Sequence, residues 1–192
     1  MRFPLDLEAY LTEDDSNVIH RINDKLTQIP YGTHCGAFGS VRAHDVHTGV
    51  DLYAPDGTPV FAIQDGTVVG SFPFTGKDAG CPWWLDTMAV VVEDEEGIWL
   101  YGEITPNERL VPGLPIAEGD CIGHVKRVLR NDKGRPVSML HLERYTCGSR
   151  EFGPVWTDGD PQPETLIDPT ELLCHFDMCL TWQRQEDAKE HG

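Results

Sequence analysis

Residues 88–104, MAVVVEDEEGIWLYGEI, contain two apolar segments separated by four residues that are acidic or glycine. Residues 88–93 and 98–104 are rich in β-branched and aromatic side chains, which favour strands. Residues 94–97 have the length and composition of a hairpin loop. The stretch therefore predicts an antiparallel β-hairpin near the middle of the chain.

Similar short apolar segments lie on both sides of this hairpin, between frequent glycines and prolines. Residues 59–63, 66–70, 121–129 and 138–146 are the further strand candidates. No helical pattern separates them, which argues against a parallel sheet with crossover helices. The predicted fold class is mainly β, an antiparallel sandwich or barrel.

Helices are predicted at the two ends of this β-rich core. In residues 16–29, apolar side chains recur with a helical period, and Pro30 ends the pattern. Near the other end, Asp168 suits a helix cap, Pro169 the first helical position and Glu171 the first turn. We therefore expect an N-terminal helix and a C-terminal helix.

The composition excludes classes of partner. The chain has 15 lysines and arginines against 32 aspartates and glutamates, a formal net charge of −17. So acidic a surface repels nucleic acids and anionic lipid headgroups, and we expect neither a nucleic-acid nor a membrane partner. No apolar signal segment opens the sequence, and no run approaches the ~20 residues of a membrane-spanning helix. We expect a cytoplasmic protein, with a mature secreted form as the alternative.

The length of 192 residues is typical of one domain. We divide it into a helical segment at 1–30, a β core at 31–173, and the remainder of the C-terminal helix with a tail at 174–192. The six cysteines include no Cys-x-x-Cys pair, so we expect reduced, mostly buried thiols rather than a disulfide framework. The sequence gives no prediction of the oligomeric state.

Candidate metal ligands occur in two separate segments. His47 and Asp51 are four residues apart, about 13 Å in an extended strand, so they can share an ion only where the chain bends. Gly49 between them permits such a bend, although a surface histidine beside an aspartate is the alternative. Far along the chain, strand alternation turns Leu140 and Leu142 to one face and leaves His141 on the other, with Met139 and Glu143 beside it. Two histidines and one carboxylate leave one of four tetrahedral positions open, the pattern of a catalytic zinc site.

The hairpin contributes a further carboxylate. Alternation along residues 98–104 predicts that Trp99, Tyr101 and Glu103 share one face. Glu103 is then a candidate to lie on the same face of the sheet as His141 and Glu143. In the long loop at 74–86, the adjacent Trp83 and Trp84 either form an apolar platform for a ligand or place one ring in the core.

Seven segments in sequence order resemble the lysostaphin-type zinc metallopeptidases. They are GAFGSVR (36–42), HTGVDLYAPDGTPV (47–60), AIQDGTVV (62–69), LYGE (100–103), EGDCIG (118–123), LHLE (140–143) and IDP (167–169). The resemblance extends over residues 36–173. It implies an antiparallel β-structure of the duplicated hybrid type, a Zn²⁺ ion held by His47, Asp51 and His141, and a peptide or muropeptide substrate.

Two positions depart from the family pattern. Active members usually carry Tyr-x-His where this chain has Tyr101 and Glu103, and His-x-His where it has Met139 and His141. Methionine cannot accept a proton at neutral pH, but a carboxylate can, so Glu103 is expected to act as general base for a zinc-activated water. Tyr101 is expected to help polarise the carbonyl.

Other side chains have weaker candidate roles. Glu143 is expected either to orient a ligand imidazole or to form a salt bridge with an arginine. His44 and His124 are candidates to replace a lost histidine, although loop histidines are usually only solvated.

These observations favour a zinc metallopeptidase that hydrolyses an amide bond in a peptide or peptidoglycan-derived substrate. The alternative is a non-catalytic binding or regulatory module that retains the fold and the metal. Residues 57–68 also resemble a lipoyl or biotinyl carrier domain, but no lysine has the Met-Lys context that such a domain uses.

Overall fold

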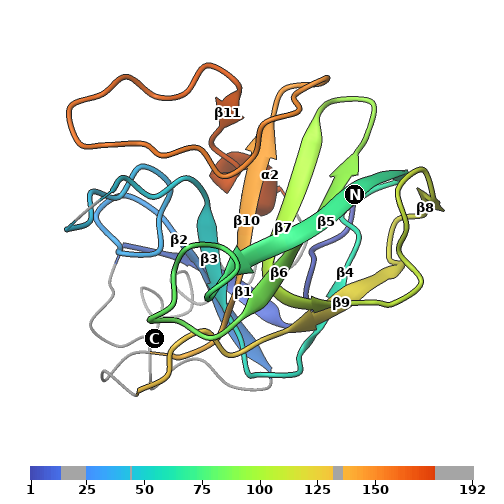
Figure 1. Cartoon of the computed structure of the whole chain (residues 1–192), viewed down its shortest axis with the longest axis horizontal. Coiled ribbons are helices and arrows are strands. Elements are labelled where there is room, and N and C mark those ends of the chain that lie inside the picture. Colours follow the sequence, from blue (N-terminus) through green and yellow to red (C-terminus); the bar gives the residue numbers. More distant parts are fainter. Residues whose placement is uncertain (14–24, 44, 132–135, 176–192) are drawn as a thin grey trace, which may run out of the picture.

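The computed structural model describes residues 1–13, 25–43, 45–131 and 136–175 (Figure 1). In these ranges the chain is mainly β, with one short helix. Nine strands form a single sheet in which every pairing is antiparallel, and two more form a separate parallel pair. The predicted mainly β, antiparallel fold class is confirmed, while the duplicated motif stays a prediction.

The described residues form eleven strands and one helix. The strands are β1 (Glu8–Thr12), β2 (Leu26–Pro30), β3 (Val50–Tyr53), β4 (Pro59–Phe61), β5 (Gly66–Thr75), β6 (Thr87–Glu93), β7 (Ile98–Pro106), β8 (Pro115–Ile116), β9 (Cys121–Val125), β10 (Met139–Tyr145) and β11 (Leu166–Ile167), and the helix is α2 (Thr170–Cys174). The sheet runs β11-β10-β7-β6-β5-β8, with β3 paired to β10 and β9 paired to both β4 and β7. Strands β7 and β10 therefore lie at its centre, side by side in Figure 1.

The predicted hairpin is formed by β6 and β7. Val91 pairs with Leu100, and the loop closes where the Asp94 N–H donates to the Gly97 carbonyl at 2.9 Å. The Asp94 carboxylate also forms a buried two-point ion pair with Arg144 of β10, with bonds of 2.6 and 3.1 Å. The loop is thus attached to the neighbouring strand.

A β-bulge interrupts β7 at Gly102 and Glu103. Because Met88 pairs with Ile104 while Val90 pairs with Tyr101, one residue of β6 faces two of β7. Glu103 has a φ of 63°, and it is the only non-glycine among the described residues in the left-handed region. Beyond the bulge β7 leaves β10 and pairs with β9. The predicted alternation is therefore wrong at this point, since the bulge turns Glu103 to the face opposite Tyr101.

The alternation predicted for β10 is confirmed. Leu140 and Leu142 are fully buried in the larger apolar core, together with Trp99 and Tyr101 of β7. Tyr145 packs in a second apolar cluster. The sheet therefore carries an apolar cluster on each face.

The predicted terminal helices are corrected by the structure. Residues 26–30, expected at the end of an N-terminal helix, are strand β2, which pairs in parallel with β1. Four of its five residues are buried, so no alternation distinguished this strand from a helix. At the other end, α2 begins at Thr170 but spans five residues. Residues 16–24 of the predicted N-terminal helix lie outside the described residues, and so do residues 176–192, the remainder of the predicted C-terminal helix with its tail.

Two further expectations concern cysteines and membranes. The five cysteines in the described ranges are all free, but four are half-buried and Cys147 is exposed, so the expectation of buried thiols is wrong. Within the same ranges, no helix combines the length and the hydrophobicity needed to cross a bilayer.

Candidate metal centre

The structure brings His47, Asp51 and His141 together. Asp51 and His141 are register partners on β3 and β10, and His47 lies in the segment that leads into β3. His47 Nε2 and Asp51 Oδ1 are 3.1 Å apart, His141 Nδ1 and Asp51 Oδ1 are 2.9 Å apart, and the two ring nitrogens are 3.1 Å apart. The predicted bend therefore exists and closes a triangle of three ligand atoms.

Gly49 makes this close approach possible. A Cβ at this position would lie 2.3 Å from the Leu142 carbonyl oxygen and 2.8 Å from His141 Nε2. Any side chain would therefore push β3 away from β10. The glycine is needed for the space that it leaves rather than for its φ angle.

The three side chains fit a zinc ion. Tetrahedral zinc with bonds of 2.0–2.1 Å separates its ligand atoms by about 3.3 Å, close to the spacing of this triangle. All three side chains are buried, and two imidazoles with one carboxylate are a donor set that suits zinc. The cluster could hold the ion with one position left for water or substrate.

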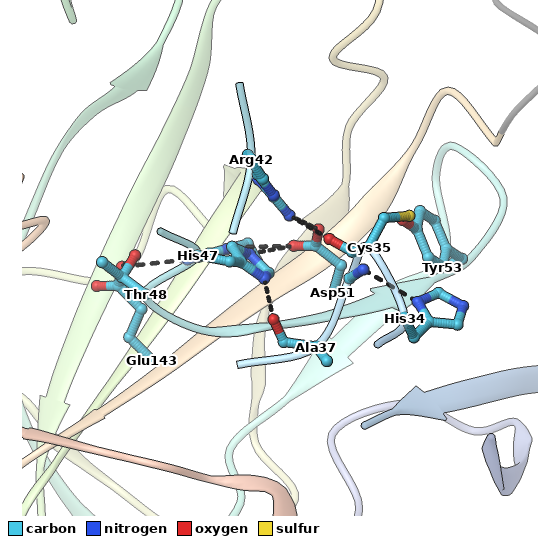
Figure 2. A network of polar contacts seen from close by, with 11 residues as sticks. His34, Cys35, Ala37, Arg42, His47, Thr48, Asp51, Tyr53 and Glu143 are labelled. Carbon is cyan, nitrogen blue, oxygen red and sulfur yellow. Dashed lines mark hydrogen bonds and ion pairs between the residues drawn. The ribbon is translucent and has the colours of Figure 1, made fainter. Parts of the chain in front are cut away.

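Each imidazole is oriented by its second nitrogen, and Figure 2 shows this for His47 and the Ala37 carbonyl. His47 Nδ1 donates to the Ala37 carbonyl at 2.9 Å, which leaves Nε2 free to bind a metal. His141 Nε2 donates to Glu143 Oε1 at 3.1 Å, which turns Nδ1 toward Asp51, where it could bind a metal once it has lost its proton. Of the two roles expected for Glu143, its contacts match the orientation of an imidazole, since its ion-pair partner is His141 and no arginine in the described residues.

Glu143 is itself held in place. Thr48 Oγ1 donates to its Oε1 at 2.5 Å, and the Tyr145 hydroxyl donates to its Oε2. The Gly153 N–H donates to the Tyr145 oxygen at 2.9 Å. These bonds connect His141 to the segment around residue 153, which borders the cavity described below.

The electrostatics of the metal-free cluster follow from burial and mutual contact. Burial alone would raise the pKa of Asp51, but His47, Arg42 and His141 hold it well below its usual range. Burial lowers the pKa of His47, although Asp51 acts in the other direction. Burial would also lower the pKa of His141, but hydrogen bonds to Asp51 and Glu143 raise it to about 10. Asp51 is therefore ionised and ready to bind a cation.

The cluster lies in a cavity of about 440 Å³. Glu103 and Met139 also line it, and Met139 packs against Tyr53. Glu103 is only 9 % exposed, and its Oε2 has no hydrogen-bond partner among the described residues. Burial and the nearby Asp51 charge raise the pKa of Glu103 to about 8, partly offset by His141 and Arg42. A buried carboxylate with an unpaired oxygen beside this cluster makes Glu103 a candidate functional group.

Tyr101 does not line this cavity. It lies in the larger apolar core, where its hydroxyl accepts a hydrogen bond from the Ile63 N–H at 3.0 Å. Burial raises the pKa of Tyr101, although the bond from the Ile63 N–H acts in the other direction, so the phenol stays protonated within the core. The expectation that Tyr101 and Glu103 share a face is wrong because of the bulge at residues 102 and 103.

Aromatic side chains form the walls of the cavity. Trp84 and Trp156 both line it, whereas Trp83 is 63 % exposed. Arg130 donates to the backbone carbonyl of Trp84 at 2.9 Å. Neither Trp83 nor Trp84 belongs to an apolar core cluster, so the alternative that one ring fills the core is wrong.

Sequence reasoning missed three residues of the site. Arg42 binds Asp51 Oδ2, and Thr48 and Tyr145 bind Glu143. Tyr145 could have been found, because it follows Glu143 at the strand period of two. No spacing rule brings Arg42 to Asp51. Of the histidines weighed as replacements, His124 is exposed on β9 and does not line the cavity, and residue 44 lies outside the described ranges.

Comparison with known families gave one match. A sequence model for peptidase family M23 matches residues 45–151, more than half of the chain. The matched segment contains the three candidate ligands together with Glu103 and Glu143. A search of curated proteins gave no match.

Several solved structures are similar to this chain. Lysostaphin from Staphylococcus simulans has 20% identity and a TM-score of 0.47 over 74% of this chain and 49% of its own. CbpA from L. salivarius REN has 24% identity and a TM-score of 0.47 over 74% and 86%. A mutant catalytic domain of the prophage-encoded M23 protein EnpA from Enterococcus faecalis has 21% identity and a TM-score of 0.43 over 65% and 77%.

Proposed function

The chain belongs to peptidase family M23, and from this membership we propose that it is a zinc-dependent metallopeptidase acting on a peptide or peptidoglycan-derived substrate. One observation carries the proposal beyond the family. The ligand atoms of His47, Asp51 and His141 converge in a cavity that also contains the buried, unpaired carboxylate of Glu103. A metal-binding cluster beside a free carboxylate is the arrangement needed for amide hydrolysis.

His47, Asp51 and His141 would hold the zinc ion. When bound, zinc supplies a Lewis acid for the peptide carbonyl and lowers the pKa of a water molecule toward neutrality. The chain contributes the orientation of its ligands: the Ala37 carbonyl and Glu143 each fix one imidazole ring. Such outer partners keep the donor atoms aimed at one point as the substrate arrives.

Glu103 is the proposed general base. Its Oε2 accepts a proton from the attacking water, and the same carboxyl group then gives a proton to the leaving nitrogen as the carbon–nitrogen bond breaks. The raised pKa of about 8 applies to the protein without metal. A divalent cation nearby favours the ionised carboxylate, so the group becomes a competent base at neutral pH.

The cavity walls favour a short, largely apolar stretch of peptide. Trp84, Val155 and Trp156 line the cavity, and a volume of about 440 Å³ is within the range of small-ligand pockets. The proposed substrate is an amide bond of a peptide or muropeptide. The proposal of peptidoglycan peptides as substrates rests on membership of family M23.

A second candidate is a metal-retaining binding module. Met139 replaces a family histidine with a side chain that cannot transfer a proton, and Tyr101 is held in the core. Both features favour a fold that has kept its ion and lost its chemistry. Hydrolysis assays distinguish the two candidates.

The deciding experiment incubates the zinc-loaded chain with a peptide library that includes peptidoglycan-derived peptides. We expect cleavage by the wild type and none by Glu103→Gln, which keeps its zinc because the ligands are intact. Equal turnover in Glu103→Gln would remove Glu103 from the mechanism. Absence of cleavage by the wild type would favour the binding module.

A further inference from the structure

Arg42 is the only lysine or arginine among the described residues that line the cavity. Its Nη2 donates to Asp51 Oδ2 at 2.8 Å and to the Cys35 carbonyl at 3.0 Å. Figure 2 shows the guanidinium of Arg42 pointing toward Asp51 and Cys35. This cation therefore contacts a candidate metal ligand directly.

The two oxygens of Asp51 have separate partners. Oδ1 lies 3.1 Å from His47 Nε2 and 2.9 Å from His141 Nδ1, whereas Oδ2 accepts the bond from Arg42. A carboxylate can bind a metal through one oxygen or through both. A charge-assisted hydrogen bond to a guanidinium is strong enough to keep Oδ2 engaged.

We propose that Arg42 is a positioning residue that restricts Asp51 to one metal-binding oxygen. The role rests on the proposed zinc site. If both oxygens of Asp51 bound the ion, the second oxygen would occupy the position that water or substrate needs. Arg42 thus keeps the centre open for the reaction, and it acts through Asp51 without touching the ion.

The local fold fixes Arg42 relative to the ligands. It belongs to a turn in which Val41 and Val46 form a bridge and the Arg42 N–H donates to the Asp45 carbonyl at 2.8 Å. At the end of this turn, the His47 N–H donates to the Ser40 carbonyl at 2.9 Å. The turn that carries Arg42 is therefore continuous with the first ligand.

The second anchor of Arg42 is fixed to the third strand. The Asp51 N–H donates to the Gly36 carbonyl at 2.9 Å, which holds Gly36, next to Cys35 in the chain, beside β3. Because Nη2 binds the Cys35 carbonyl as well as Asp51, the guanidinium is held from two sides. The bond to the Cys35 carbonyl therefore opposes a rotation of the carboxylate that would bring Oδ2 to the ion.

The test uses Arg42→Met, with Arg42→Ala as a second neutral variant if the first fails to fold. Arg42→Lys keeps the charge and a donor. Arg150→Met is the matched control, since Arg150 forms an exposed ion pair with Glu93 and does not line the cavity. The readouts are the visible spectrum of the cobalt(II)-substituted protein, the zinc dissociation constant from chelator competition, and kcat.

We expect Arg42→Met to bind zinc at least as tightly as the wild type, because a nearby positive charge is gone. Its cobalt bands should weaken, as they do when a fifth ligand joins four, and kcat should fall about 10-fold to 100-fold. Arg42→Lys and Arg150→Met should keep the wild-type spectrum.

Cobalt bands of wild-type intensity in both neutral variants would overturn this role for Arg42, and so would weaker zinc binding in both. Neither readout depends on hydrolysis. A catalytically inactive wild type with the expected spectra would therefore overturn the proposed function alone. A wild type that binds neither ion would overturn both.

Discussion

Glu103 carries two features that are unfavourable for stability. A left-handed backbone costs a non-glycine residue about 1–2 kcal/mol, and Glu103 has a φ of 63°. Its carboxylate is also buried with an unpaired oxygen. Strain and an unsatisfied polar group at one residue are typical of functional sites, where stability is given up for activity.

We therefore expect Glu103→Gly to stabilise the metal-free protein while abolishing hydrolysis. Glycine adopts a positive φ without strain, so the free energy of unfolding should rise by about 1–2 kcal/mol in a denaturant titration. Glu103→Gln is the control, because it removes the charge and keeps the strained backbone. A lower free energy of unfolding in Glu103→Gly would show that the carboxylate stabilises the fold.

Tyr145 offers a test of how His141 is oriented. Tyr145→Phe removes the hydroxyl that donates to Glu143 Oε2, so the partner of the His141 ring loses a support. We expect the zinc affinity to fall about 10-fold, measured by chelator competition. Tyr101→Phe is the matched control: it also removes a buried hydroxyl, but one bound to the Ile63 N–H away from the site. An equal loss of zinc affinity in both variants would contradict the orienting role.

At the scale of secondary-structure elements, strands β3 and β10 carry two of the candidate metal ligands, Asp51 and His141. Their pairing depends on Gly49, where an added Cβ would lie 2.3 Å from the Leu142 carbonyl oxygen. We expect Gly49→Ala to lower the free energy of unfolding by about 1–3 kcal/mol and to weaken zinc binding, because the clash separates the strands. Gly70→Ala on β5 is the control, since nothing lies within 4 Å of its added Cβ. Calorimetry on both variants checks this, and equal melting temperatures would contradict it.

The elements that the sequence predicted are those with local causes. The β6–β7 hairpin and the inward leucines of β10 follow from composition and alternation within a few residues. Strand β2 was mistaken for a helix because its parallel partner lies 18 positions earlier and its residues are buried on both faces. Burial of that kind leaves no period to read.

The same distinction between local and distant causes applies to the candidate site. His47, Asp51 and His141 could be predicted because motif and alternation place them, and Glu143 because it follows His141 by two. The orientation of Glu103 could not, since the bulge arises where β7 changes partner from β10 to β9. Such an exchange depends on strands distant in the sequence, and the same is true of Arg42.

At the scale of the whole molecule, the net charge of −17 bears on the substrate to test first. An acidic protein is a poor electrostatic match for anionic wall polymers, whereas short neutral or cationic peptides meet no such barrier. This favours peptides and muropeptides over intact cell wall in the first assays. The apolar cavity walls formed by Trp84 and Trp156 favour the same choice of substrate.

Metal analysis of the purified chain tests most directly whether His47, Asp51 and His141 hold one catalytic zinc ion. We predict close to one zinc per chain for the wild type and none for His141→Ala, because the variant lacks one of the three ligand atoms. A His124→Ala variant, changed at an exposed histidine outside the cavity, should keep its zinc. A wild-type protein that is folded and free of metal, even after incubation with zinc, would contradict the account.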